Sequence, residues 1–227
     1  MRTLVPGEVR GSSAVSRGRP GYSTRMDTVR VLLDKAGTTY AEQAGIALAD
    51  KPAPLYRLLV LSTLLSTRIK ADIAVDAAKE LKRYGTPRKM LDASWQDRVD
   101  ALGRAHYVRY DESTATALGD GAKLLLDEYG GDLRKIRGDD LHKNLRRFPR
   151  MGPVGADIFC REAQAVWPEL RPYLDKKTLD GAKKIGLPTD QDKLAGLAAK
   201  DDLPKLAAAL VRVSLDKKLA DAVRGDR

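Results

Sequence analysis

The chain has 227 residues, of which 43% are hydrophobic and 32% are charged. This balance argues against a disordered chain, and the length is enough for one domain or two small lobes with a real core. Lysine and arginine number 41 against 31 acidic residues, and the net charge of +10 favours a polyanionic partner such as nucleic acid, although a basic solvated surface is also common.

Cys160 is the only cysteine, and His106 and His142 are the only histidines. One cysteine forms no disulfide within the chain and cannot hold an iron–sulfur cluster, which needs about four thiolates. Two histidines make a dedicated zinc site a poor expectation. No segment has the roughly 18 apolar residues of a membrane span, and no apolar run near the N-terminus indicates a secretory signal. We therefore expect a cytoplasmic protein without membrane contact or metal cluster, and we expect a monomer.

Residues 1–25 are rich in glycine, serine and arginine and contain one acid. This composition predicts a disordered basic tail, either a DNA-contacting arm or a tail without a role. From Met26 onward apolar residues recur at helical spacing, and residues 40–49 predict a second short helix. Pro52 and Pro54 then mark a lobe boundary.

Helical patterns continue through the rest of the chain. Residues 55–66 are almost continuously apolar, too short for a membrane span and too rich in leucine for a strand, so they predict a buried helix. Thr86 before Pro87 and Ser94 before Trp95 are typical N-cap positions. No strand pattern or internal repeat is found, so the predicted fold class is all-α. Further helices are expected over residues 69–81, 111–129, 141–147, 154–166, 190–199 and 203–223.

A hairpin is predicted between the helices expected over residues 141–147 and 154–166. Pro149 and Pro153 cannot lie inside a regular helix, and Gly152 tolerates a positive φ. Such a hairpin directs the free N–H groups of the second helix outward, where they suit an anion. The basic residues around this turn are Arg146, Arg147 and Arg150. We expect a phosphate to bind there.

Three landmarks follow one another in order along the chain. An apolar segment ends in Leu64-Leu65-Ser66-Thr67-Arg68, the hairpin has the sequence Phe148-Pro149-Arg150-Met151-Gly152-Pro153, and Asp175 follows the turn after Trp167-Pro168. This ordered set resembles the endonuclease III-like DNA glycosylase superfamily, whose landmarks are Leu-Leu-Ser-x-Gln, Leu-Pro-Gly-Val-Gly and a downstream aspartate. Arg150 replaces the first glycine of the family's hairpin. The resemblance covers residues 52–188.

The resemblance implies two helical lobes that bind double-stranded DNA across the cleft between them. Residues 52–165 would form a six-helix lobe that includes the helix-hairpin-helix, and residues 26–51 together with 166–227 would form the second lobe. Gly152, Val154 and Gly155 would contact the DNA backbone with the neighbouring arginines. The resemblance also implies a sodium or potassium ion held by hairpin carbonyls near Met151.

The resemblance also implies a chemistry. Removing a base breaks an N-glycosidic bond, and a carboxylate can stabilise the oxocarbenium character of the sugar. Asp175 matches the family's aspartate, although it is equally suited to cap the next helix. Glycosylases that also cut the strand form a Schiff base through a lysine, but Val154 stands at that position. Lys176 and Lys177 follow the aspartate instead.

Extruding a base leaves a hole in the duplex that side chains must fill. Arg68 stands where the family's glutamine helps to fill it, and a surface role is the alternative. The loop over residues 103–110 would supply a second wedge, for which Arg104, His106 and Tyr107 are candidates. A tyrosine there is equally suited to pack between helices.

Three other residues near the hairpin have simpler interpretations. Asp157 and Glu162 are expected to be ion-paired or solvated rather than catalytic, and Cys160 is expected to be a small buried residue. The sequence therefore predicts a base-excision repair glycosylase, a hydrolase without lyase activity. The alternatives are a helix-hairpin-helix module that binds DNA without catalysis, and a lyase that uses Lys176 or Lys177.

Overall fold

The computed structural model describes residues 20–225, with side chains from residue 24 onward, and every regular element in this part of the chain is helical. The predicted all-α fold class is therefore confirmed. None of the described helices combines the length and the apolar character needed to cross a lipid bilayer.

The elements follow one another closely along the chain. The α-helices are α1 (Pro20–Ala36), α2 (Tyr40–Gln43), α3 (Pro52–Leu65), α4 (Ala71–Glu80), α5 (Pro87–Asp92), α6 (Trp95–Arg104), α7 (Asp111–Tyr129), α8 (Leu141–Leu145), α9 (Pro153–Ala163), α10 (Lys176–Lys184), α11 (Gln191–Ala195), α12 (Leu203–Leu215) and α13 (Lys217–Gly225). The short 3₁₀ helices are η1 (Leu81–Tyr84), η2 (Leu133–Ile136), η3 (Pro168–Leu170) and η4 (Lys200–Asp202).

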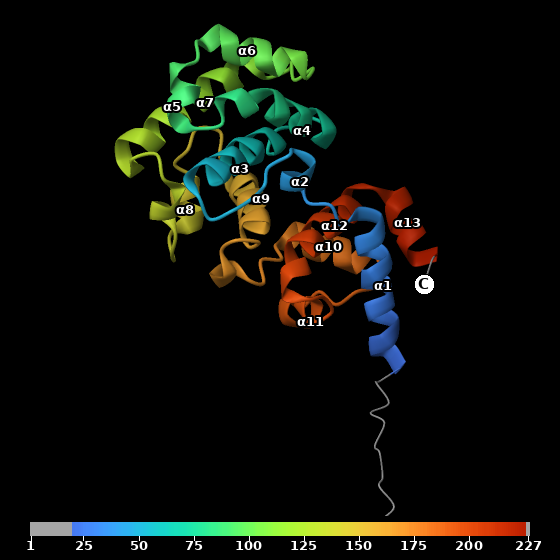
Figure 1. Cartoon of the computed structure of the whole chain (residues 1–227). Coiled ribbons are helices and arrows are strands. Elements are labelled where there is room, and N and C mark those ends of the chain that lie inside the picture. The colour runs from blue at the N-terminus through green and yellow to red at the C-terminus, as the bar shows by residue number, and fades with distance from the viewer. Residues whose placement is uncertain (1–19, 226–227) are drawn as a thin grey trace, which may run out of the picture.

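These helices form two lobes, each around a core of its own (Figure 1). The core of the larger lobe includes the fully buried Tyr56, Tyr107, Phe159 and Trp167. In the smaller lobe α12 contacts α1, α10 and α13. Helix α9 connects the two, because it contacts α3 in the larger lobe and α12 in the smaller one.

The lobe boundaries differ from those expected. Tyr40 and Ala41 of α2 belong to the core of the larger lobe, because their backbone N–H groups donate to the buried carboxylate of Glu162 at 3.1 and 3.0 Å. At the other end Trp167 also lies in the larger core, and the smaller core resumes at Leu174. The larger lobe therefore extends beyond residues 52–165 on both sides.

The N-terminal boundary also differs from the expected one. Helix α1 begins at Pro20 rather than near Met26, so residues 20–25 are helical rather than part of a disordered tail. The remainder of the predicted tail, residues 1–19, lies outside the described residues.

The predicted caps and stops are confirmed where the signal is local. The Thr86 side chain accepts a hydrogen bond from the N–H group of Lys89 at the start of α5. Ser94 and Asp97 form a capping box at the start of α6. Gly130 ends α7 with a φ of 60°, in the left-handed region that glycine adopts without strain.

Two predicted helices are shorter than expected. The helix expected over residues 203–223 breaks into α12 and α13, because the Asp216 side chain accepts a hydrogen bond from the N–H group of Lys218 at 2.8 Å and starts a new helix. The helix expected over residues 40–49 stops at Gln43, and Gly45 follows with a φ of 62°.

Candidate nucleic-acid interface and inter-lobe pocket

The predicted helix-hairpin-helix is present, with α8 and α9 joined by a short turn. Gly152 does not use its tolerance of a positive φ: it is extended, with a φ of −78°, and serves as the N-cap of α9. Arg150 has the positive φ instead, at 61°. A left-handed backbone costs an L-residue about 1–2 kcal/mol, so the hairpin keeps a long cationic side chain at a position that would suit glycine better.

The first turn of α9 has backbone donors without partners. Pro153 has no N–H group, and the first intrahelical bond runs from the N–H group of Ala156 to the carbonyl of Gly152 at 3.0 Å. The N–H groups of Val154 and Gly155 therefore have no acceptor among the described residues, and no side chain caps the helix. Free N–H groups of this kind are what an anion site at the turn would need. The carbonyl of Met151 likewise accepts no hydrogen bond from the described residues, so it fits the role of a cation ligand.

The three arginines of the hairpin have different surroundings. Arg147 is bound to Glu128, with its Nη2 at 2.5 Å from the carboxylate, and it donates to the Tyr129 hydroxyl at 2.6 Å. Arg150 donates to the Ser113 hydroxyl at 2.9 Å. Arg146 is exposed and has no polar partner among the described residues. Arg146 is therefore the residue of the three that is most available to a phosphate.

Gly155 lies where the hairpin meets the end of α3. A Cβ atom there would lie 2.5 Å from the sulfur of Met151 and 3.3 Å from the Cβ of Ser66, so a larger residue would require the Met151 side chain to move. Beside this contact, Arg68 and Arg150 line one recess of about 400 Å³, together with Ser66, Thr67 and Tyr110. Arg68 is exposed and unpaired among the described residues, and Arg150 lies over the Tyr110 ring at 5.5 Å from its centroid.

In the loop after α6, fewer residues than expected are available to contact DNA. A DNA contact for Tyr107 is contradicted: its side chain is fully buried, and its hydroxyl lies 2.8 Å from the Thr67 hydroxyl. Arg104 is bound to Glu80 at 2.7 Å. His106 remains exposed, with a φ of 58°. Val108 was not predicted as a wedge candidate, yet this residue is 63% exposed. Its position as an apolar residue inside a polar loop could have indicated it from the sequence.

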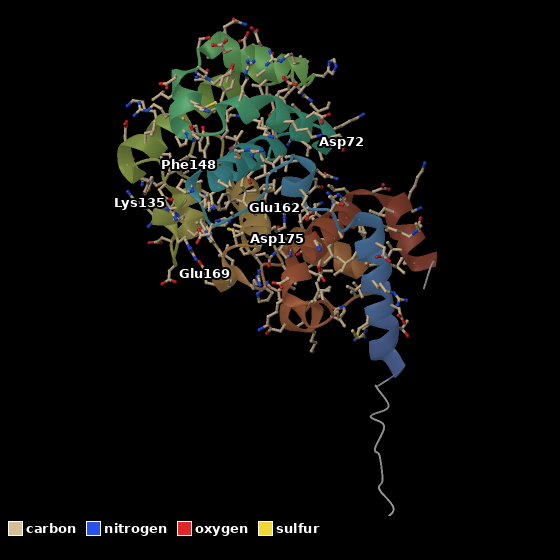
Figure 2. The ribbon with its side chains drawn as sticks, viewed as in Figure 1. Asp72, Lys135, Phe148, Glu162, Glu169 and Asp175 are labelled. Atoms are coloured by element: carbon tan, nitrogen blue, oxygen red, sulfur yellow. The ribbon has the colours of Figure 1, made fainter. Side chains whose placement is uncertain are left out.

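A pocket of about 640 Å³ lies where α9 meets the smaller lobe. Figure 2 shows Glu162 and Asp175 near this junction. Its apolar wall consists mainly of Tyr40, Leu65, Ile69, Val154, Ile158, Val211 and Leu215. Its charged lining consists of Asp157, Arg161, Asp175, Lys176, Lys177 and Asp180.

Asp175 lies in this pocket and also caps α10. One oxygen, Oδ1, accepts a hydrogen bond from the N–H group of Thr178 at 3.2 Å. The other, Oδ2, accepts one from Arg161 at 2.7 Å. The Asp175 and Arg161 side chains are only 11% and 9% exposed, so each offsets part of the cost of burying the other's charge. Both interpretations of Asp175, as a pocket carboxylate and as a helix cap, are compatible with this geometry.

The acidic residues and the cysteine of α9 have distinct surroundings. Glu162 is buried, and burial raises the pKa of its carboxyl group despite the two N–H donors of α2. The expectation of a solvated or ion-paired side chain was wrong for this residue. Cys160 is buried as expected, and burial raises the pKa of its thiol to about 12, so the thiol is unreactive. Asp157 lines the pocket rather than the solvated surface.

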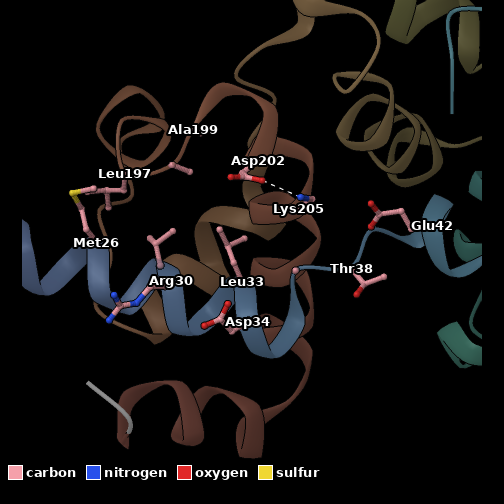
Figure 3. Close-up of a pocket in the computed structure, with 13 residues that line it drawn as sticks. Met26, Arg30, Leu33, Asp34, Thr38, Glu42, Leu197, Ala199, Asp202 and Lys205 are labelled. Carbon is pink, nitrogen blue, oxygen red and sulfur yellow. Dashed lines mark hydrogen bonds and ion pairs between the residues drawn. The ribbon is translucent and has the colours of Figure 1, made fainter. Parts of the chain in front are cut away.

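A second hollow lies in the smaller lobe beside α1 (Figure 3). It is an open groove of about 760 Å³, lined by α1, by residues 197–205 and, at one end, by Thr38 and by Glu42 of α2. Asp202 and Lys205 form an ion pair of 3.0 Å on its wall. None of the expected site residues lines it, so the inter-lobe pocket is the candidate site.

No family model matches the chain, and no curated protein matches it. Among solved structures, the chain is similar to endonuclease III in a trapped covalent intermediate with DNA, an estranged-adenine complex, and to endonuclease III in a non-covalent complex with DNA. The sequence identities are 15% and 14%, and in both cases the match covers 82% of this chain and 84% of the other, with a TM-score of 0.47.

Proposed function

We propose that the protein is a DNA glycosylase of base-excision repair that hydrolyses the N-glycosidic bond of a damaged or mispaired base. One observation carries the proposal: Val154, in the first turn after the hairpin, and Asp175, a nearly buried carboxylate, line the same pocket. A hairpin that binds the DNA backbone would therefore deliver an extruded nucleotide directly to a carboxylate.

The DNA step uses the unpaired donors of the hairpin. Phosphate oxygens would accept from the N–H groups of Val154 and Gly155 and from the guanidinium of Arg146. Arg68 and Arg150 would reach the duplex beside the pocket. A sodium or potassium ion on the Met151 carbonyl would fit the same turn, and its role would be to bridge protein and phosphate.

The chemical step uses the charge of Asp175. As the bond to the base breaks, positive charge develops on the sugar, and a fixed carboxylate in an apolar pocket stabilises it more strongly than water does. Arg161 holds this carboxylate in one orientation by the 2.7 Å hydrogen bond. The apolar wall excludes bulk water from the reacting atoms.

The proposal includes hydrolysis without strand cleavage, because Val154 has no nucleophile. One observation favours a lyase as the second candidate: Lys177 lines the pocket, is half-buried and has no acidic partner among the described residues. Lys176 is less suited, since its side chain is 91% exposed and lies 3.6 Å from Asp180. A DNA-binding module without catalysis is the third candidate.

The test is an excision screen with Asp175→Asn beside the wild type. The substrates are duplexes that each carry one alkylated, oxidised, deaminated or mispaired base, and an alkaline step makes base loss visible. We expect the wild type to excise at least one lesion and Asp175→Asn to lose most of that activity, with binding to an abasic-analogue duplex retained. Asp190→Asn is the matched control, because Asp190 caps α11 through the N–H group of Lys193 at 2.9 Å, outside the pocket.

Three results separate the candidates. Full activity of Asp175→Asn would remove this carboxylate from the mechanism. A covalent adduct trapped by borohydride in the wild type, and lost in Lys177→Ala, would establish the lyase. Binding without excision of any lesion by the wild type would leave the non-catalytic module.

A further inference from the structure

The inter-lobe pocket contains a second carboxylate, Asp157, that the proposed mechanism does not use. Asp157 lies on α9, one turn after Val154, and both residues line the pocket. Its side chain is 30% exposed, so it is open to the pocket but shielded from bulk solvent on its other side.

Two donors fix one oxygen of Asp157 and leave the other free. The Tyr173 hydroxyl donates to Oδ1 at 2.6 Å, and Nε2 of His142 lies 3.1 Å from the same oxygen. Oδ2 has no hydrogen-bond partner among the described residues. The carboxylate is therefore held in one orientation, with a free acceptor.

Asp175 is occupied in a different way. Its two oxygens accept hydrogen bonds from the N–H group of Thr178 and from Arg161, so neither oxygen is left free to accept a proton from water. Asp157 has no cationic partner except His142 when that residue is protonated. Of the two carboxylates, Asp157 is therefore the one with an oxygen, Oδ2, that is free to accept a hydrogen bond from water.

We propose that Asp157 is the general base of the reaction, which accepts a proton from the water molecule that attacks the sugar. This inference rests on the proposed glycosylase function. The water oxygen forms a bond to C1′ as the bond between C1′ and the base nitrogen breaks, and that bonding pair leaves with the base. One water proton passes to Oδ2 of Asp157 and then to solvent, and the departing base takes a proton from solvent.

Tyr173 and His142 are positioning residues in this arrangement. Burial, together with the hydrogen bond to Asp157, raises the pKa of the Tyr173 hydroxyl far above its usual range. The hydroxyl therefore stays protonated and donates at any working pH. The other titratable or charged groups around Asp157 are His142 on α8, Cys160 and Arg161 on α9, Tyr40 on α2, and Asp175, Lys176, Lys177 and Asp180 at the start of α10.

The decisive variant is Asp157→Asn, which keeps an oxygen to accept from Tyr173 and removes the base. Its excision rate is measured in single turnover on the lesion duplex that the wild type processes fastest. General-base catalysis contributes about 10²–10⁴-fold, and we expect a loss in this range with unchanged affinity for a tetrahydrofuran abasic-analogue duplex. We also expect the acidic limb of the wild-type pH–rate profile, where Asp157 takes up a proton, to disappear.

Two further variants make the test specific. Asp140→Asn removes an exposed carboxylate at the start of α8 that has no pocket contact, and it should keep the wild-type rate. Tyr173→Phe keeps the carboxylate and removes its hydroxyl donor. It should slow excision less than Asp157→Asn does and should shift the acidic limb upward, because the carboxylate then holds its proton more tightly.

Failure of the inference is distinguishable from failure of the proposed function. If Asp157→Asn excises as fast as the wild type with the same pH profile, Asp157 is not the base, and the glycosylase proposal stands. If the wild type excises no lesion in the panel, both are overturned. If Asp157→Asn does not fold, an unshifted acidic limb in Tyr173→Phe overturns the inference by itself.

Discussion

Arg146 and Arg147 are neighbours in the chain, but their surroundings set different expectations for DNA binding. Arg146 is exposed and unpaired among the described residues, whereas Arg147 is bound to Glu128 and Tyr129. We expect Arg146→Gln to weaken binding to any duplex and to reduce the slope of log affinity against log salt by about 1, since one fewer counterion is released. Arg147→Gln should change the slope less. Fluorescence anisotropy over a salt series measures both, and equal slopes in the two variants would place the phosphates elsewhere.

The buried carboxyl group of Glu162 predicts that the stability of the protein depends on pH. Because burial raises the pKa of its carboxyl group in the folded state, the folded chain binds more protons than the unfolded chain between the unfolded pKa of about 4.3 and the raised pKa of the folded state. Stability from this group is therefore present at low pH and is lost as the pH rises through the raised pKa. Glu162→Gln cannot titrate, so it should gain stability relative to the wild type as the pH rises from about 4.3 through the raised pKa. Urea denaturation at several pH values measures this difference, and a constant difference would contradict it.

At the residue scale, the charged residues of the site could be predicted from the sequence, but their hydrogen-bond and ion-pair partners could not. The hairpin arginines follow from residue type and spacing and Asp175 follows from the family resemblance, and the structure places them at the turn and in the pocket. The partners of Arg147 and Asp157 come from other elements and loops of the chain. The Tyr107 side chain is buried where the loop after α6 meets Thr67, in the segment after α3. The spacing of residues in the sequence does not predict these partners or this burial.

At the scale of elements, helix starts were easier to predict than helix ends. Ser94 and Thr86 cap helices through residues three positions away, which is a local pattern. The break at Asp216 was missed because the apolar pattern continues across it from α12 into α13. The early end of α2 was missed because α2 is held by Glu162, a residue far along the chain.

The close contact between α10 and α12 predicts how a substitution at Gly181 affects both stability and the pocket that contains Asp175. A Cβ atom at Gly181 would overlap the backbone carbonyl of Leu210, which cannot move aside as a flexible side chain would. Gly181→Ala should push α10 away from α12, lower the free energy of unfolding by about 1–3 kcal/mol or more, and reduce excision because Asp175 caps α10. Gly103→Ala on α6 is the control, since a Cβ there meets nothing within 4 Å. Thermal denaturation and the excision assay compare the two, and equal stability would show that the helices adjust freely.

At the scale of the whole molecule, two lobes were predicted, but the positions where the chain passes from one lobe to the other differ from the predicted ones. Prolines at residues 52 and 54 suggested that the chain changes lobes there. In the structure those prolines lie in the first turn of α3, and α2 before them already belongs to the larger lobe. The change of lobe comes between Ala36 and Tyr40, and again between Trp167 and Leu174. Helix α9 therefore presents one end to the hairpin and its side to the smaller lobe.

The last prediction concerns which face of the molecule DNA covers. The unpaired donors of the hairpin, Arg68 and the exposed His106 belong to segments around the larger lobe's end of the pocket. Hydrogen exchange of the Asp175→Asn variant with and without an abasic-analogue duplex should therefore show slower exchange in residues 66–68, 105–110 and 146–155. Residues 197–205, which line the open groove beside α1, should exchange at an unchanged rate.

In this hydrogen-exchange experiment the groove serves as an internal control, because residues 197–205 and the pocket belong to the same chain and are measured under the same conditions. A general slowing of exchange from ligand-induced stabilisation would affect both lobes in proportion to their unfolding, whereas a bound duplex protects the segments that it contacts. Protection confined to residues 197–205 would move the DNA to the smaller lobe, and the hairpin would then lose its proposed role. Protection of the hairpin alone, without residues 66–68 and 105–110, would mean that the duplex does not extend over the entrance of the pocket.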